Sequence, residues 1–244
     1  MFKNLRYLWA LLALALVPVA AEAAGVSPMV VEVKPLGRGS IARIELSNPS
    51  QAEFPVEVQM FRGIISERGE LELTPADEEF LLFPAQRIVP AQSQQVFRLQ
   101  YIGEPELSES EIYYMQIRQI PVDIKPGESQ VQVVVNFNIL VNVVPDGTNP
   151  EPMFESITPV VRDDVAGVEV RLANHGSRYF MAGLSPWQIT GTADDGSPAD
   201  VRLPADAVAK LIGVGVVAPG RARVFFIPTD KPLVEGSIQA KLGS

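Results

Sequence analysis

The 244-residue sequence contains no cysteine and one histidine, His175. Without cysteine the chain can form no disulfide, thiolate zinc site, iron–sulfur cluster or cysteine nucleophile. The single histidine leaves little for metal binding or histidine-based catalysis. The 20 Lys+Arg residues face 29 Asp+Glu residues, a net charge of −9, and nucleic-acid binding needs concentrated basic side chains. The composition therefore argues against most enzymes and against a nucleic-acid partner, and we expect no metal and no cofactor.

A few residues remain that could carry other chemistry. His175 and Ser177 lie close together in a segment typical of a turn. The adjacent acids Asp163-Asp164 and Asp194-Asp195 resemble solvated turns more than an acid–base pair, and they lack the alternate spacing of an EF-hand. Trp187 could mark a sugar-binding face, but a core position in a sandwich explains it equally simply. None of these patterns predicts an active site.

The first residues are typical of an export signal. Lys3 and Arg6 precede an apolar run from Leu8 to Ala21, and a small-x-small motif ends at Ala23. The run has about 14 residues, whereas a membrane span needs about 20. We therefore expect residues 1–23 to be a cleaved signal peptide. No later segment reaches spanning length, so we expect no membrane insertion of the mature chain.

Most of the remaining sequence alternates between apolar and polar residues. A period of two with one apolar face indicates half-buried antiparallel strands. Such alternation covers four segments: Ile41 to Asn48, Val56 to Met60, Phe97 to Tyr101 and Tyr113 to Ile117. Turn residues separate these segments at the spacing of a β-sandwich. The only helix expected is short, from Ala205 to Ile212.

The second half of the chain repeats features of the first. Leu46-Ser47-Asn48 recurs 126 residues later as Leu172-Ala173-Asn174, and Val89-Pro90 is matched by Ala218-Pro219. Chance similarity between strands is the alternative explanation. A Pro- and Gly-rich segment from Pro145 to Pro152 is suited to a linker. We therefore expect an all-β chain of two tandem immunoglobulin-like sandwiches, comprising residues 24–147 and 148–244.

One expected strand is unusually long. Gln130 to Val144 runs fifteen residues without a turn signal, or roughly 50 Å at about 3.3 Å per residue. Its odd-numbered positions are apolar throughout: Val131, Val133, Val135, Phe137, Ile139, Val141 and Val143. Part of this strand could project beyond its own core and act as a template for a strand of another chain. Periodicity alone leaves equally open that these valines pack inside their own sandwich.

The mature chain resembles the periplasmic chaperones of the chaperone–usher pilus pathway. The resemblance covers nearly the whole mature chain and is stronger in the first half. It depends on the order and spacing of several segments: Val26-Ser27-Pro28, Leu46-Ser47-Asn48, Pro55-Val56, Phe83 to Pro90, Phe97-Arg98-Leu99, Tyr114 to Pro121, the long strand and Pro145. The resemblance implies two immunoglobulin-like domains set at an angle.

The resemblance also implies a function. A chaperone of this family lends its long strand to a pilus subunit whose sandwich lacks one strand. Aligned on Pro145, the lent residues are Val131, Val133 and Val135, with Phe137 as a fourth. The implied partners are pilus subunits and an outer-membrane usher, and the implied location is the periplasm. The alternative is an exported two-domain adhesin or carbohydrate-binding surface protein.

The sequence departs from the family where the subunit's C-terminal carboxylate is anchored. Most members place an Arg on the first strand and a Lys on the long strand, and here Val30 and Leu140 occupy those positions. The possible substitutes are Arg87, Arg98 and Arg118. If the alignment of the first strand is shifted, Lys34 becomes a further candidate. Val144 stands where the family has an interdomain Arg, so we expect a different cleft.

Overall fold

The computed structural model describes residues 24–121 and 134–243. The expected signal peptide, residues 1–23, lies outside this range, as do Val131 and Val133. No helix in the described part of the chain is long and apolar enough to cross a bilayer. The expected helix is confirmed as α2, Ala205–Ile212.

The first sandwich packs two sheets face to face. One sheet has the order β1-β3-β8-β6, and the other has the order β2-β10-β9-β4-β5, with β7 paired to β4. The strands are β1 (Gly25–Ser27), β2 (Val30–Val33), β3 (Ile41–Asn48), β4 (Phe54–Ile65), β5 (Leu71–Pro75), β6 (Phe80–Phe83), β7 (Gln86–Val89), β8 (Ser93–Tyr101), β9 (Glu111–Gln119) and β10 (Asn136–Val143). Short 3-10 turns occupy Gly37–Ser40 and Asp77–Glu79.

The second sandwich contains smaller sheets. Their orders are β11-β12-β17, β13-β16 and β15-β14-β18. The strands are β11 (Pro152–Arg162), β12 (Val165–Asn174), β13 (Phe180–Met181), β14 (Trp187–Thr192), β15 (Pro198–Leu203), β16 (Val216–Val217), β17 (Ala222–Pro228) and β18 (Gln239–Leu242), with a 3-10 turn, η3, at Ala182–Leu184. Trp187 is 2% exposed and packs edge-on against Phe154 and Phe225. It is therefore a core residue and not part of an exposed sugar-binding face.

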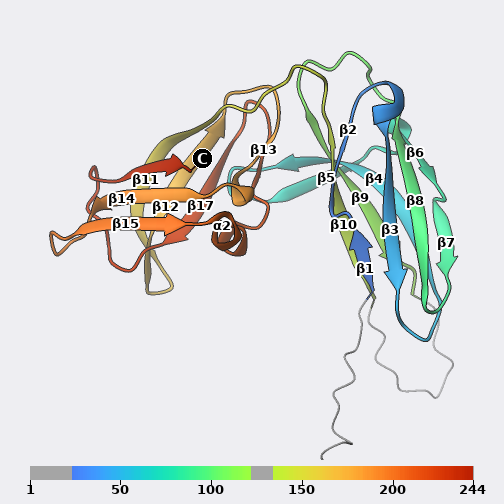
Figure 1. Ribbon diagram of the computed structural model, residues 1–244, viewed down its shortest axis with the longest axis horizontal. Helices are drawn as coiled ribbons and strands as arrows, with labels where there is room; N and C mark the ends of the chain where they lie inside the picture. The colour runs from blue at the N-terminus through green and yellow to red at the C-terminus, as the bar shows by residue number, and fades with distance from the viewer. Residues whose placement is uncertain (1–23, 122–133, 244) are drawn as a thin grey trace, which may run out of the picture.

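The expected all-β class is confirmed, and the four alternating segments lie within β3, β4, β8 and β9. Their apolar faces meet in the first core, around residues such as Ile44, Met60 and Leu99. Figure 1 shows the two sandwiches set at an angle, joined at the top of the view by the segment between β10 and β11. The sheet that contains β10 and β2 is the one that faces the second sandwich.

The repeated asparagine has the same structural role in both sandwiches. The Asn48 amide donates to the carbonyls of Ala52 and Val89 (2.9 and 3.3 Å), and its oxygen accepts from the Ser50 amide. The equivalent partners of Asn174 lie 126 to 128 residues later: its amide donates to Arg178 and Val217 (2.7 and 3.2 Å), and its oxygen accepts from Gly176. Both side chains are 1% exposed. Each asparagine satisfies backbone groups where its strand ends, which gives the sequence repeat a physical cause.

Candidate strand-addition site

The edge of β10 is only partly covered. On one side β10 pairs with β9 along its whole length, from Asn136 opposite Arg118 to Val143 opposite Glu111. On the other side β2 runs parallel to it, and only from Leu140 onward. The Leu140 amide donates to the Met29 carbonyl at 3.0 Å, which marks where β2 begins to close this edge.

Odd- and even-numbered residues of β10 direct their backbone groups to opposite sides of the strand, which shows which of these groups are exposed. The amide of Gln119 on β9 donates to the carbonyl of Val135, so odd-numbered residues of this segment point their backbone groups toward β9. Even-numbered residues point theirs the other way, as Leu140 does toward Met29. The backbone N–H and C=O groups of Asn136 and Asn138 consequently have no strand partner among residues 24–121 and 134–243. This is a short open sheet edge.

The sequence predicted one strand of fifteen residues, and the described strand is shorter. Regular pairing covers Asn136–Val143, while Val134 and Val135 precede the strand and residues 130–133 lie outside the described range. Val135 nevertheless remains tied to β9, because its amide donates to the Gln119 side chain at 3.2 Å. Within residues 134–243, β10 is therefore a strand of eight residues preceded by a partly paired extension.

Of the four predicted lent residues, two can be placed. Val135 is half-buried, and Phe137 is half-buried against the first core. Further along, Ile139, Val141 and Val143 are each 0% exposed. Within residues 134–143, burial of the odd-numbered side chains therefore increases along the strand and is complete from Ile139 onward. The lending of Val131, Val133, Val135 and Phe137 remains a prediction.

The two positions where basic anchors are absent lie side by side. Leu140 and Val30 are directly paired across the two parallel strands. They belong to a third apolar cluster, which also contains Tyr179 and Val216 of the second sandwich and which we call the interdomain cluster. Val144, at the missing interdomain Arg position, is part of it as well. Apolar contacts thus fill the inner end of the cleft where the family resemblance places charge.

None of the substitute cations lies beside Val30 and Leu140. Arg118 is paired with Glu57 on the neighbouring strands β9 and β4. Arg98 lies on β8 in the other sheet, and Arg87 lies on β7, beyond β4. Lys34 bonds to Asp146 at 2.6 Å, next to the linker.

Polar contacts on both sides of the interdomain cluster hold the sandwiches together. Both carboxylate oxygens of Glu32 accept hydrogen bonds from Arg178, at 2.8 and 2.7 Å, and the Tyr179 hydroxyl also donates to Glu32. The Ser110 hydroxyl accepts from the Tyr179 amide at 2.7 Å. Burial opposes ionisation of Glu32, but the hydrogen bonds from Tyr179 and Arg178 outweigh it and lower the pKa of this carboxyl.

The hairpin between β4 and β5 reaches from the first sandwich onto the second. At its tip, the Glu67 carbonyl accepts from the Val224 amide on β17 at 2.7 Å, and the Glu67 carboxylate pairs with Arg171 at 2.7 Å. Arg68 pairs with Glu169 at 3.4 Å. No sequence pattern predicted this bridge. Its one signal was the length of β4, twelve residues, which is about twice that of an average strand.

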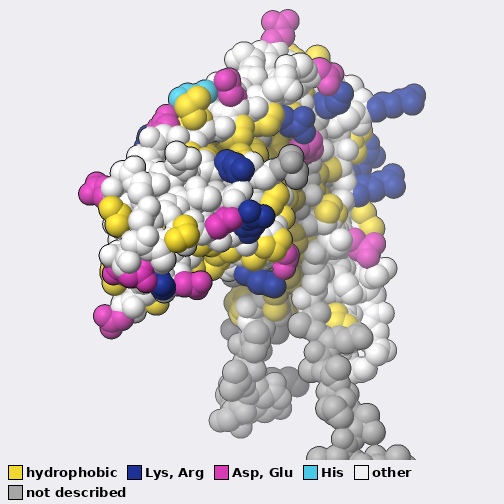
Figure 2. All heavy atoms as spheres, turned by 60° about the vertical axis from the view of Figure 1, so that its left-hand side comes forward, with side chains coloured by type: hydrophobic (Ala, Val, Ile, Leu, Met, Phe, Trp, Pro, Cys, Tyr) yellow, Lys and Arg dark blue, Asp and Glu magenta, His cyan; other side chains and the backbone are white. Residues whose placement is uncertain are grey.

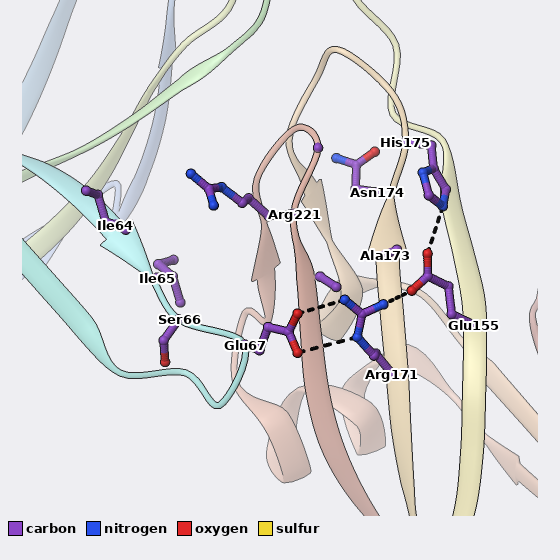
Figure 3. Close-up of a pocket in the computed structure, with 12 residues that line it drawn as sticks. Ile64, Ile65, Ser66, Glu67, Glu155, Arg171, Ala173, Asn174, His175 and Arg221 are labelled. Carbon is purple, nitrogen blue, oxygen red and sulfur yellow. Dashed lines mark hydrogen bonds and ion pairs between the residues drawn. The ribbon is translucent and has the colours of Figure 1, made fainter.

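A hollow of about 290 Å³ lies behind this hairpin (Figure 3). Arg171 joins Glu67 on one side to Glu155 on the other, and His175 Nε2 lies 3.1 Å from Glu155. Arg221 points toward Ile64, away from this chain of charges. His175 thus contacts the Glu155 carboxylate rather than forming a histidine–serine pair, and no cluster of metal-ligating side chains is found in the described ranges.

Comparison with known proteins finds chains of similar fold but of low sequence identity. No family model and no curated protein matches the chain. Among solved structures, the YadV chaperone is similar at 13% identity over 91% of this chain and 92% of that chain, with a TM-score of 0.54. CfaA, a class 5 fimbriae chaperone, is similar at 13% identity over 91% and 99%, with a TM-score of 0.52.

A solved structure of the Salmonella enterica SafA pilin in complex with the SafB chaperone also matches, at 16% identity over 84% of each chain, with a TM-score of 0.51. The chain therefore has the two-sandwich fold of fimbrial chaperones, which is the fold that the sequence resemblance implied.

Proposed function

We propose that this protein is a divergent periplasmic chaperone of the chaperone–usher pathway, which binds fimbrial subunits by strand addition and delivers them to an outer-membrane usher. The observation that carries the proposal is the open edge of β10 at Asn136 and Asn138. A strand of another chain placed there would satisfy these backbone groups, and β2 would limit how far it could extend.

The side chains around this edge suit a strand-deficient partner. Val135 and Phe137 are only half-buried, and Val134 is 39% exposed, so apolar surface remains available where the edge is open. A buried valine contributes about 1.5–3 kcal/mol when it leaves water. In Figure 2, apolar side chains gather in the hollow between the two halves of the molecule, with basic side chains nearby. Under this proposal the subunit contacts both the open edge and this hollow.

The test is capture of the fimbrial subunits of the native host, co-expressed with the tagged chaperone in the periplasm. We expect Val135→Asp and Val133→Asp to abolish recovery of subunit, because a carboxylate cannot enter an apolar groove without a partner. The matched control is Val161→Asp, at a valine that is 64% exposed on β11 of the second sandwich. Circular dichroism checks that each variant is folded. Normal recovery of subunit by folded Val135→Asp and Val133→Asp variants would refute the proposal.

A further inference from the structure

Asn142, on β10, has a buried side-chain amide without a hydrogen-bond partner. The residue is 0% exposed, yet neither its amide nitrogen nor its oxygen has a partner within the described ranges. Asn48 and Asn174 are buried almost as completely, and both atoms of each side-chain amide are bonded to backbone groups. Because buried polar groups in native proteins are nearly always paired, this difference singles out Asn142.

Asn142 lies in the contact between the two sandwiches. Side chains alternate between the faces of a strand, so Asn142 shares a face with Leu140 and Val144, which belong to the interdomain cluster. Its cross-strand partners are Ile112 on β9, another member of the cluster, and Glu32 on β2. Asn142 therefore places a polar amide among the apolar side chains that join the sandwiches.

The polar contacts nearby leave Asn142 unsatisfied. The Glu32 carboxylate accepts from Arg178 and Tyr179, and the Tyr179 amide donates to Ser110, so these groups are already paired with one another. An amide that gives up its hydrogen bonds to water without replacement opposes its own burial. Separation of the sandwiches would return Asn142 to water, so this side chain favours the separated arrangement.

The ion pairs between the sandwiches do little to prevent separation. In the pair of Arg178 with Glu32 the side chains are 36% and 43% exposed, and in the pair of Arg171 with Glu67 they are 35% and 53% exposed. Ion pairs with this access to solvent contribute modestly to stability. The interdomain cluster must therefore supply much of the contact energy, and Asn142 weakens the contact from within that cluster.

We propose that the two sandwiches separate reversibly at the interdomain cluster while each remains folded, and that Asn142 determines how readily they do so. Separation uncovers Leu140 and Val30 at the inner end of the open edge of β10. The apolar surface of the cleft is thus adjustable. This inference does not depend on the proposed function, because it is tested on the chain alone.

Hydrogen exchange at two amides reports separation directly. The Tyr179 amide donates to Ser110 Oγ at 2.7 Å, and the Ser110 amide donates to the Ser177 carbonyl at 2.8 Å, so both bonds cross between the sandwiches. In protein lacking residues 1–23, NMR should show these two amides exchanging together. Both should exchange more readily than the amides of Met115 and Val170, on the central strands β9 and β12. Equal protection at all four amides would overturn the inference, because the sandwiches would then not separate.

The role of Asn142 is tested by replacing its amide with an apolar side chain. Asn142→Leu has a similar size, and we expect it to slow exchange at the Tyr179 and Ser110 amides by roughly tenfold to a hundredfold. Asn142→Val, with a smaller side chain, should do the same where leucine does not fit. The matched control is Asn138→Leu, at an exposed asparagine on the same face of β10, and it should leave both rates unchanged.

Circular dichroism checks that each variant is folded. If neither Asn142→Leu nor Asn142→Val slows exchange at the two reporter amides, the buried amide does not control separation and the inference is wrong. The inference also fails if Asn138→Leu slows exchange as much as the variants at Asn142 do.

Discussion

β10 and β17 both have an edge with no strand neighbour over part of its length, and only the edge of β17 is covered by another segment. Each strand has a neighbour along one side and exposes backbone groups on the other. At β17 the Val224 amide is taken up by Glu67 at the tip of the β4–β5 hairpin. At β10 no described residue takes up Asn136 or Asn138. Because an exposed edge invites pairing with other chains, this difference is what the proposed strand addition at β10 requires.

The two hydrogen-bonding edges of β10 can be tested with proline, which removes a backbone N–H. Asn138→Pro deletes a donor on the open side, where proline is tolerated, and we expect complete loss of subunit binding with little change in stability. Phe137→Pro deletes a donor directed at β9, where Phe137 lies opposite Ile117. We expect this control to destabilise the first sandwich by roughly 1–3 kcal/mol or more. Co-purification and urea unfolding give the two readouts.

If Asn138→Pro binds subunit as well as the unchanged protein does, the open edge is not the binding site. If both proline variants are destabilised equally, the assignment of Phe137 to the β9 edge and of Asn138 to the open edge is wrong.

The matched asparagines allow the two sandwiches to be destabilised one at a time. Asn48→Ala and Asn174→Ala should each cost roughly 3 kcal/mol, because several buried backbone groups lose their partners. Trp187 is buried in the second core, and the only other tryptophan, Trp9, lies in the expected signal peptide. In protein lacking residues 1–23, fluorescence should therefore report Asn174→Ala directly, whereas circular dichroism should report both variants. Identical fluorescence transitions for the two variants would mean that the sandwiches unfold as one unit.

The strands of the first sandwich and the repeat between the two sandwiches could be predicted from the sequence. The alternation of Ala42, Ile44 and Leu46 determined β3 because one buried face requires a period of two. The spacing of Asn48 and Asn174 indicated two similar sandwiches in tandem, but not the hydrogen bonds that these asparagines make. The open edge could not be predicted, since it depends on where β2 joins β10, and a parallel pairing has no local sequence pattern. The contact of Glu67 with Val224 was missed for a similar reason, as it depends on the tertiary packing of the hairpin against β17.

The contact at Glu32 predicts an effect of pH on the angle between the sandwiches. The pKa of Glu32 is lower in the folded protein than its usual value, so its stabilising effect is present above the usual carboxylate range. It is lost as the pH falls through the lowered pKa. Small-angle scattering should show a fixed angle at neutral pH and a broader distribution of angles in acid. Glu32→Gln should remove most of this pH dependence, and an unchanged acid response in that variant would assign it to other groups.

The smallest effect on stability is expected at the edge of β17, which the β4–β5 hairpin covers. Glu67 is exposed and Arg171 is partly exposed, so their ion pair should contribute little to stability. Glu67→Ala keeps the main-chain contact with Val224, because the carbonyl is unaffected. We expect unchanged unfolding and slightly faster hydrogen exchange of the Val224 amide, measured by NMR. Glu67→Pro is the sharper variant, since a constrained backbone at the tip should move that carbonyl and expose the β17 edge. If the Val224 amide exchanges as slowly in Glu67→Pro as in the unchanged protein, the hairpin does not protect this edge.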